Sequence, residues 1–216
     1  MESVTTRRLL AKGNSKLGES VFAWSIPAKK TCPGKTPTCE AVCYADSGRF
    51  KTGIVRNAAT RNFTASKRSD FVQRMSREVF GRGVLVVRVH VSGDFYSPAY
   101  TRKWIKIVEA CPETRFYAYT RSWSVPTIAT ELKVLSALNN FKMWYSTDKD
   151  SGAMVLPEGV REAWLQVDED EGGEPALIFR TKKSRRLSLP LSAPTCAQES
   201  DPSSGVNCSN CQVCWT

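Results

Sequence analysis

Apolar and polar positions follow two different periods along most of the chain. Continuous or alternating apolar runs, typical of strands, are separated by stretches in which apolar residues recur every three to four positions, as in helices. The strands are expected over 21–27, 84–91, 115–120, 141–146, 163–167 and 176–180; the helices over 58–67, 69–80, 97–110 and 125–138; and a helical turn over 157–162. Strands that alternate with helices in this way predict a parallel sheet, either an open one or a partial barrel.

Capping and breaking residues support several of these boundaries. Ser69 is the expected N-cap of the second helix, which Gly81 and Gly83 end, and Ser97-Pro98 supplies a cap and a first-turn proline for the third. We predict a single α/β domain over 1–216, built as a partial (β/α)6-like barrel with parallel strands. An N-terminal arm (1–20) precedes it, and a Cys-rich tail (188–216) follows it.

Length and composition exclude several classes of protein. The 216 residues are 41% hydrophobic, which argues against disorder, and no apolar run is long enough to cross a membrane. The first residues lack the apolar core and the cleavage site of an export signal. We therefore expect a cytoplasmic protein, in the host cytoplasm if it is phage-encoded. In that reducing compartment, cysteines are metal ligands more often than disulfide partners.

Seven of the eight cysteines fall into two groups. The N-terminal group follows the first expected strand and the C-terminal group closes the chain: Cys32, Cys39 and Cys43 form the first, and Cys196, Cys208, Cys211 and Cys214 the second. Cys111 stands apart as an expected core residue. Three thiolates leave one position open on a zinc ion or a cluster iron, whereas four complete a zinc site or a cluster.

This spacing predicts one or two 4Fe-4S clusters, with zinc as the alternative at the C-terminal group. A single cluster on the three N-terminal thiols plus one C-terminal thiol remains open as well.

Polar residues gather at the end of the expected strand 84–91. Its odd positions are all apolar, as in a face that helices cover: Leu85, Val87, Val89 and Val91. Its even positions turn polar at Arg88, His90 and Ser92 and lead into Gly93-Asp94. The carboxyl ends of parallel strands carry the active sites of barrels, so we predict Arg88, His90 and Asp94 as catalytic residues. The alternative is that Arg88 and His90 are satisfied core residues.

The next two strand ends should reach the same mouth of the barrel. They contribute Tyr119, Thr120 and Arg121 after one strand, and Ser146, Thr147 and Asp148 after the next. The small loop Ser92-Gly93-Asp94 exposes its backbone and carries a carboxylate, so it can hold an amine. We predict that Ser92, Gly93, Asp94, Tyr119 and Arg121 bind a cofactor.

The chain is basic, with 31 lysines and arginines against 21 aspartates and glutamates. A charge of +10 is compatible with contacts to nucleic acid or to a host protein. Six basic residues lie along one expected helical region: Arg56, Arg61, Lys67, Arg68, Arg74 and Arg77. Because the charges are spread out and no nucleic-acid-binding motif is present, the sequence favours a solvated face over a specific site.

Several motifs resemble those of a phage-encoded family known as gene product eighty-eight. They lie at 25–34, 39–45, 88–95 and 117–123 and in the terminal cysteine run, and together they cover nearly the whole chain. The family carries no established reaction. The resemblance therefore implies a fold and a site rather than a function.

The arrangement more distantly resembles radical S-adenosylmethionine (SAM) enzymes. The resemblance implies that Cys32, Cys39 and Cys43 hold a 4Fe-4S cluster whose open iron binds SAM. Tyr44 matches an aromatic residue beside the last cysteine, Ser92-Gly93-Asp94 takes the place of a Gly-Gly-Glu stretch, and the C-terminal cysteines hold an auxiliary cluster. The spacing here is C-x6-C-x3-C, whereas that class usually shows C-x3-C-x2-C.

Three functions follow from these observations. The first is a catalyst that works at the open iron. The second is a non-catalytic iron-sulfur protein with a redox, structural or binding role, whose basic surface contacts nucleic acid or a host protein. The third is structural zinc at both ends, which the missing fourth ligand of the N-terminal group disfavours.

Overall fold

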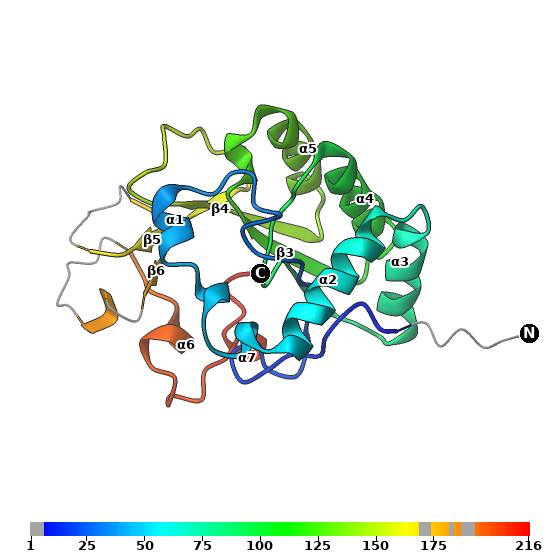
Figure 1. Cartoon of the computed structure of the whole chain (residues 1–216), viewed down its shortest axis with the longest axis horizontal. Coiled ribbons are helices and arrows are strands. Elements are labelled where there is room, and N and C mark those ends of the chain that lie inside the picture. The colour runs from blue at the N-terminus through cyan, green and yellow to red at the C-terminus, as the bar shows by residue number, and fades with distance from the viewer. Residues whose placement is uncertain (1–6, 169–173, 182–183, 187–192) are drawn as a thin grey trace, which may run out of the picture.

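The computed structural model describes residues 7–168, 174–181, 184–186 and 193–216. Its centre is one sheet of six parallel strands in the order β1-β2-β3-β4-β5-β6, curled into a half-barrel (Figure 1). The strands are β1 (Val21–Ala23), β2 (Val86–Val89), β3 (Arg115–Thr120), β4 (Phe141–Thr147), β5 (Arg161–Gln166) and β6 (Leu177–Arg180). The predicted parallel half-barrel is thus confirmed, and the carboxyl ends of all six strands share one edge.

Helices occupy the first three connections between strands. They are α2 (Gly53–Lys67) and α3 (Phe71–Gly81) between β1 and β2, α4 (Pro98–Glu109) before β3, and α5 (Pro126–Ser136) before β4. Figure 1 shows α3, α4 and α5 side by side along the outer side of the sheet. The connection from β4 to β5 contains no helix, because the chain turns at Glu158-Gly159 and enters β5 at Arg161. The helical turn predicted over 157–162 is therefore wrong.

Other predicted boundaries shift for local reasons. β2 begins only at Val86, so Leu85 lies before the strand and its exposed fraction is 65%, against the prediction of a helix-covered position. Asp70 replaces Ser69 as the N-cap of α3. Ser97 caps α4 as predicted, because its side chain accepts a hydrogen bond from the backbone N–H of Tyr100. Three short helices were not predicted: α1 (Pro37–Ala41), α6 (Ala197–Ser200) and α7 (Cys208–Cys211).

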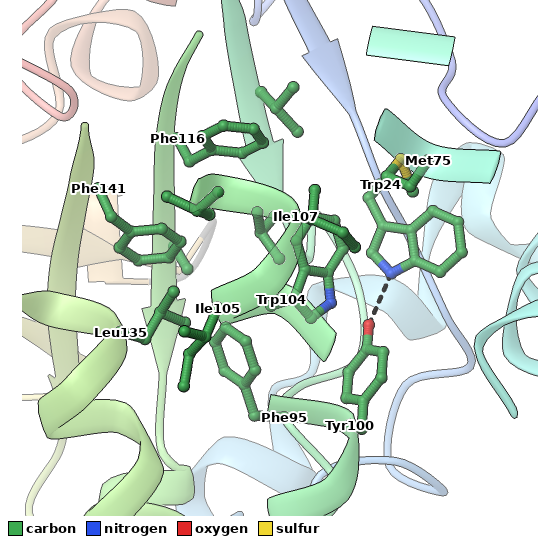
Figure 2. Close-up of a cluster of buried hydrophobic side chains, with 14 of the residues drawn as sticks. Trp24, Met75, Phe95, Tyr100, Trp104, Ile105, Ile107, Phe116, Leu135 and Phe141 are labelled. Atoms are coloured by element: carbon green, nitrogen blue, oxygen red, sulfur yellow. Dashed lines mark hydrogen bonds between the residues drawn. The ribbon is translucent and has the colours of Figure 1, made fainter. Parts of the chain in front are cut away.

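The main hydrophobic core fills the space between the sheet and the outer helices. Phe116 from β3 and Phe141 from β4 meet Trp104 and Ile107 from α4 there (Figure 2). Burying side chains of this size contributes about 1.5–3 kcal/mol each. This core makes the sheet a rigid platform for the loops at its carboxyl edge.

The inner face of the sheet packs against the C-terminal tail. Trp215 is buried against Tyr117 of β3, and the indole N–H of Trp144 in β4 donates to the carbonyl of Cys214 at 2.9 Å. Arg161 of β5 donates to the carbonyl of Thr216 at 2.7 Å. In Figure 1 the C-terminus accordingly lies in the middle of the view, close to β3.

The arm before β1 is fixed at both of its described ends. Ala11 forms an antiparallel bridge with Ala23, and the backbone N–H groups of Leu9 and Leu10 donate to the carboxylate of Glu78. The acidic segment at 169–173, the residues 182–183 and the start of the tail at 187–192 lie outside the described residues. No helix in the described part has the length and apolarity needed to span a bilayer.

Candidate cysteine-lined site

The N-terminal thiol group sits in a short, ordered loop. Thr36 caps α1 by accepting a hydrogen bond from the backbone N–H of Cys39 at 3.0 Å. Cys32 precedes this helix and Cys43 follows it, and the three thiols lie close enough to interact electrostatically. Burial raises the pKa of Cys32 to about 12. A nearby cation or metal is therefore needed to hold that sulfur as a thiolate.

The loop after β2 anchors the start of this cysteine loop. The Ser92 hydroxyl donates to the Ile26 carbonyl at 2.9 Å, and the Asp94 N–H donates to the Thr31 carbonyl at 3.1 Å. Between them, Gly93 has a φ of 79°, and a Cβ added there would lie 2.4 Å from the Ile26 Cγ1 atom. Only glycine allows this approach of two backbones. The predicted ligand-binding loop thus holds the cysteine loop in place.

Asp94 joins the ends of β2 and β3. Its carboxylate accepts hydrogen bonds from the Phe95 N–H at 2.7 Å, the Thr120 hydroxyl at 2.6 Å and the Arg121 N–H at 2.9 Å. Burial raises the pKa of Asp94, while these hydrogen bonds act in the opposite direction. Three protein donors already occupy a group that accepts about four. The geometry therefore assigns Asp94 a positioning role.

A buried ion pair fixes the other side of the loop. The guanidinium of Arg121 lies 2.8 Å from the carboxylate of Asp148, which also accepts a hydrogen bond from the Thr36 hydroxyl at 2.6 Å. Burial raises the pKa of Cys39, and the positive charge of Arg121 lowers it. Arg121 thus supplies a fixed positive charge beside the Cys39 thiol. Arg121 and Asp148, which directly follow β3 and β4, therefore lie beside the cysteine loop.

The C-terminal thiol group lies on the inner face of the sheet. Cys196, Cys208 and Cys214 interact electrostatically, and Cys211 ends α7. The hydroxyl of Tyr119 donates to the Cys214 sulfur at 2.8 Å, and burial raises the pKa of that thiol to about 11. Such O–H···S contacts tune sulfur ligands where a metal is bound.

Tyr117 belongs to the same set although sequence reasoning missed it. It lies two residues before Tyr119 on the inner face of β3, and its hydroxyl faces the Cys208 thiol. The period of two in a strand could have identified it, because Tyr119 was already a candidate.

Arg88 lies beside the C-terminal thiol group and near Tyr44. Its guanidinium stands 5.5 Å from the ring centroid of Tyr119 and interacts electrostatically with Tyr44 and with Cys208. Tyr44 in turn interacts with all three N-terminal thiols, and its hydroxyl donates to the Val91 carbonyl. The Nε atom of Arg88 is buried without a hydrogen-bond partner among the described residues. Arg88 therefore places a fixed positive charge beside the C-terminal thiols, as its interactions with Cys208 and Cys214 show.

His90 does not share the inner face with Arg88, and that prediction is wrong. The strand ends at Val89, and His90 takes a φ of 63°, which turns its side chain to the outer side. Its ring lies 4.6 Å from that of Phe95, and its Nε2 atom is 2.9 Å from the Tyr100 hydroxyl. Burial lowers the pKa of His90 to about 3. His90 is thus a neutral residue of the aromatic core.

This environment predicts a pH dependence of stability. A proton binds His90 near pH 6.5 in the unfolded chain but only near pH 3 in the folded one, so His90 favours the unfolded chain as the pH falls between these values. We expect the free energy of unfolding to drop by up to about 1.4 kcal/mol per pH unit from this residue. The variant His90→Asn, which tolerates a positive φ, should lose that component. Urea titrations from pH 7 to pH 4 measure this free energy of unfolding for both proteins. Parallel curves of free energy against pH for the wild-type protein and His90→Asn would contradict the prediction.

The described residues contain no preformed site for a single metal ion. No three histidine, cysteine, aspartate or glutamate side chains among them stand close enough together to hold one. Sulfur ligands of a 4Fe-4S cube bind four different irons and so stand farther apart than the ligands of one ion. Thiols are ligands of zinc and of iron-sulfur clusters alike.

Comparison with known proteins identifies the family. The family model described as Gene product 88 matches residues 3–216. The chain belongs to the gene product 88 family. Relatives are the Gene 88 protein of Mycobacterium phage D29, 27% identical over 66% of this chain, and that of Mycobacterium phage L5, 29% identical over 56%.

The matched regions span 63% and 54% of these two relatives' own lengths. No solved structure matches the chain. These matches support the phage family and lend no support to the resemblance to radical SAM enzymes.

Proposed function

We propose that this gene product 88 protein is an iron-sulfur protein. In this proposal, Cys32, Cys39 and Cys43 hold a 4Fe-4S cluster with one open iron at the mouth of the half-barrel. The single observation that carries it is the gathering of these three thiols, which interact electrostatically with one another in one ordered loop beside Arg121. When bound, such a cluster supplies one-electron transfer and a coordination position for a small ligand.

The surroundings of the N-terminal thiols fit this role. Arg121 offsets the negative charge of a Cys39 thiolate, and the clamp formed by Ser92, Gly93 and Asp94 holds the loop against the sheet. Tyr44 covers the loop towards the inner face through its contact with the Val91 carbonyl. A rigid loop keeps three sulfurs at fixed positions, which favours one cluster geometry over others.

The C-terminal thiols supply a second metal site in the proposal. Cys196, Cys208 and Cys214 would hold it together with Cys211, which lies on the same short helix as Cys208. Burial raises the pKa of Cys196 while the charge of Lys16 acts in the opposite direction, and Tyr119 donates a hydrogen bond to the Cys214 sulfur. A second 4Fe-4S cluster and structural zinc remain the two candidates for this site.

A radical SAM-like activity is the second candidate function. A cavity of about 270 Å³ next to the cysteine loop favours it, with Asp46, Phe50 and Ser92 in its wall. A small ligand of the open iron could enter there. Asp94 and Arg121 are committed to protein partners, so in this proposal they position the loop.

Anaerobic purification tests the proposal. Iron, sulfide and zinc are counted per chain, and the electron paramagnetic resonance (EPR) spectrum of the reduced protein is recorded with and without SAM. We expect about four irons for one cluster or about eight for two, and a signal typical of a reduced 4Fe-4S cluster. Zinc without iron would overturn the iron-sulfur proposal.

The SAM comparison separates the two functions. A signal that shifts when SAM is added supports the catalyst, because SAM then binds the open iron. Iron with an unchanged signal excludes SAM as its ligand and leaves a redox or structural role for the cluster. A signal that instead shifts with cyanide, a small ligand of open iron, would keep the open position without SAM.

A further inference from the structure

A second feature lies away from the cysteines, between the N-terminal arm and the helices α2 and α3. A cavity of about 310 Å³ opens there, with five arginines in its wall. Arg7 and Arg8 come from the arm, Arg61 from α2 and Arg74 from α3, and Arg68 directly follows the end of α2. Segments far apart in the sequence thus bring guanidinium groups to one hollow.

The arm is held at this place by polar contacts rather than by charge. The side-chain amide of Asn62 donates to the Leu9 carbonyl at 3.3 Å, while the Leu9 N–H is bound to Glu78. The position of Arg7 and Arg8 over α2 is therefore built into the fold. Leu9 itself is buried in the main core.

Most of the positive charge in this cavity is not neutralised. Arg68 pairs with Asp70 at 2.9 Å. Within the described part of the chain, Arg7, Arg8, Arg61 and Arg74 have no carboxylate within ion-pair distance, and none of the residues in the wall is acidic. Guanidinium groups that are brought together without counter-charges repel one another, and a bound anion relieves that repulsion.

We propose that this cavity binds backbone phosphates of nucleic acid. Planar guanidinium groups bind phosphate oxygens through two hydrogen bonds at once, so a cluster of four unpaired arginines fits more than one phosphate. Further exposed basic residues, Arg56, Lys67 and Arg77, continue along α2 and α3 beyond the cavity. A strand with a phosphate at every nucleotide matches such an extended surface better than a single free anion does.

The test uses the full chain and a fluorescein-labelled oligonucleotide, single-stranded or duplex. The double variant Arg61→Gln/Arg74→Gln removes two charges from the cavity. The matched control, Lys106→Gln/Lys133→Gln, removes two exposed charges from α4 and α5 and leaves the net charge equal. Anisotropy is measured at several salt concentrations, and circular dichroism compares the folding of the variants.

We expect the wild-type protein and the control to bind with the same salt dependence. The cavity variant should bind about tenfold more weakly at ~0.1 M salt, with a slope of log K against log salt that is smaller by about two for duplex DNA. Equal losses in both variants would overturn the proposal in favour of a diffuse basic surface. Binding of pyrophosphate to a protein that binds no oligonucleotide would overturn it in favour of a small anion.

The iron content of the same variants keeps this inference separate from the proposed function. Cavity variants that lose oligonucleotide binding but keep their iron support the cavity as an independent site. Loss of iron in the cavity variant alone would show that the substitutions act through the fold and would overturn the assignment.

Discussion

Replacing Cys43 with alanine should remove the iron of the N-terminal site while the chain stays folded. Cys43 lies in a half-buried loop position before Tyr44 and belongs to none of the hydrophobic clusters, so the fold loses little packing. The proposed cluster would lose one of its three protein ligands, and two thiolates rarely retain a 4Fe-4S cube. We expect the iron content to fall by about four per chain, together with the visible absorption of the cluster.

Cys111→Ala is the matched control for this substitution. Cys111 is buried in the main core at the end of α4, away from both thiol groups. Its loss should lower the thermal midpoint slightly through lost packing and leave the iron unchanged. Unchanged iron in Cys43→Ala would contradict the assignment of the N-terminal ligands. The variant Cys214→Ala then distinguishes two clusters from a single cluster that Cys214 shares with the N-terminal thiols. If the cluster is shared in this way, Cys214→Ala also loses all of the iron.

The sheet could be predicted because its strands are buried on both faces. In β3 and β4 successive side chains alternate between the outer core and the inner face, so the period of two is unbroken within each strand, from Phe116 to Tyr119 and from Phe141 to Tyr145. The carboxyl edge followed from the parallel arrangement, which placed Arg121 and Asp148 beside the cysteine loop as expected. Local patterns of this kind are readable because each residue contacts its strand neighbours.

The rest depended on contacts that no local pattern contains. The left-handed backbone conformation of His90 itself turns its side chain away from the inner face, and the sequence carries no signal for that turn. The insertion of Trp215 against Tyr117 joins residues almost one hundred positions apart. The arginine cavity likewise arises only when the arm folds over α2. A charge distribution that is diffuse in the sequence therefore becomes concentrated in space.

Asp94→Asn should destabilise the fold more than any other isosteric change at the site. The Asp94 carboxylate accepts hydrogen bonds from three donors, two of them backbone N–H groups that have no other partner to replace it. An amide of the same size offers one acceptor oxygen and turns its own NH2 group towards a donor. We expect the free energy of unfolding in urea to fall by about 2–4 kcal/mol, since each unsatisfied buried group costs about 1–3 kcal/mol.

Asp70→Asn is the control for the removal of a carboxylate charge. Asp70 pairs with Arg68 at the surface, where solvent screens the interaction, so its unfolding curve should match that of the wild-type protein. If Asp94 only bound a ligand, the urea unfolding curve of Asp94→Asn should also match that of the wild-type protein. That result would contradict the positioning role.

A destabilised Asp94 variant has a consequence for the metal site. Asp94 holds the end of β3 and, through its own N–H, the Thr31 carbonyl at the start of the cysteine loop. Loosening this clamp should weaken iron binding even under conditions in which the sheet stays folded. Iron release from Asp94→Asn at urea concentrations below its unfolding midpoint would therefore link the polar clamp at the strand ends to the cysteines that it positions.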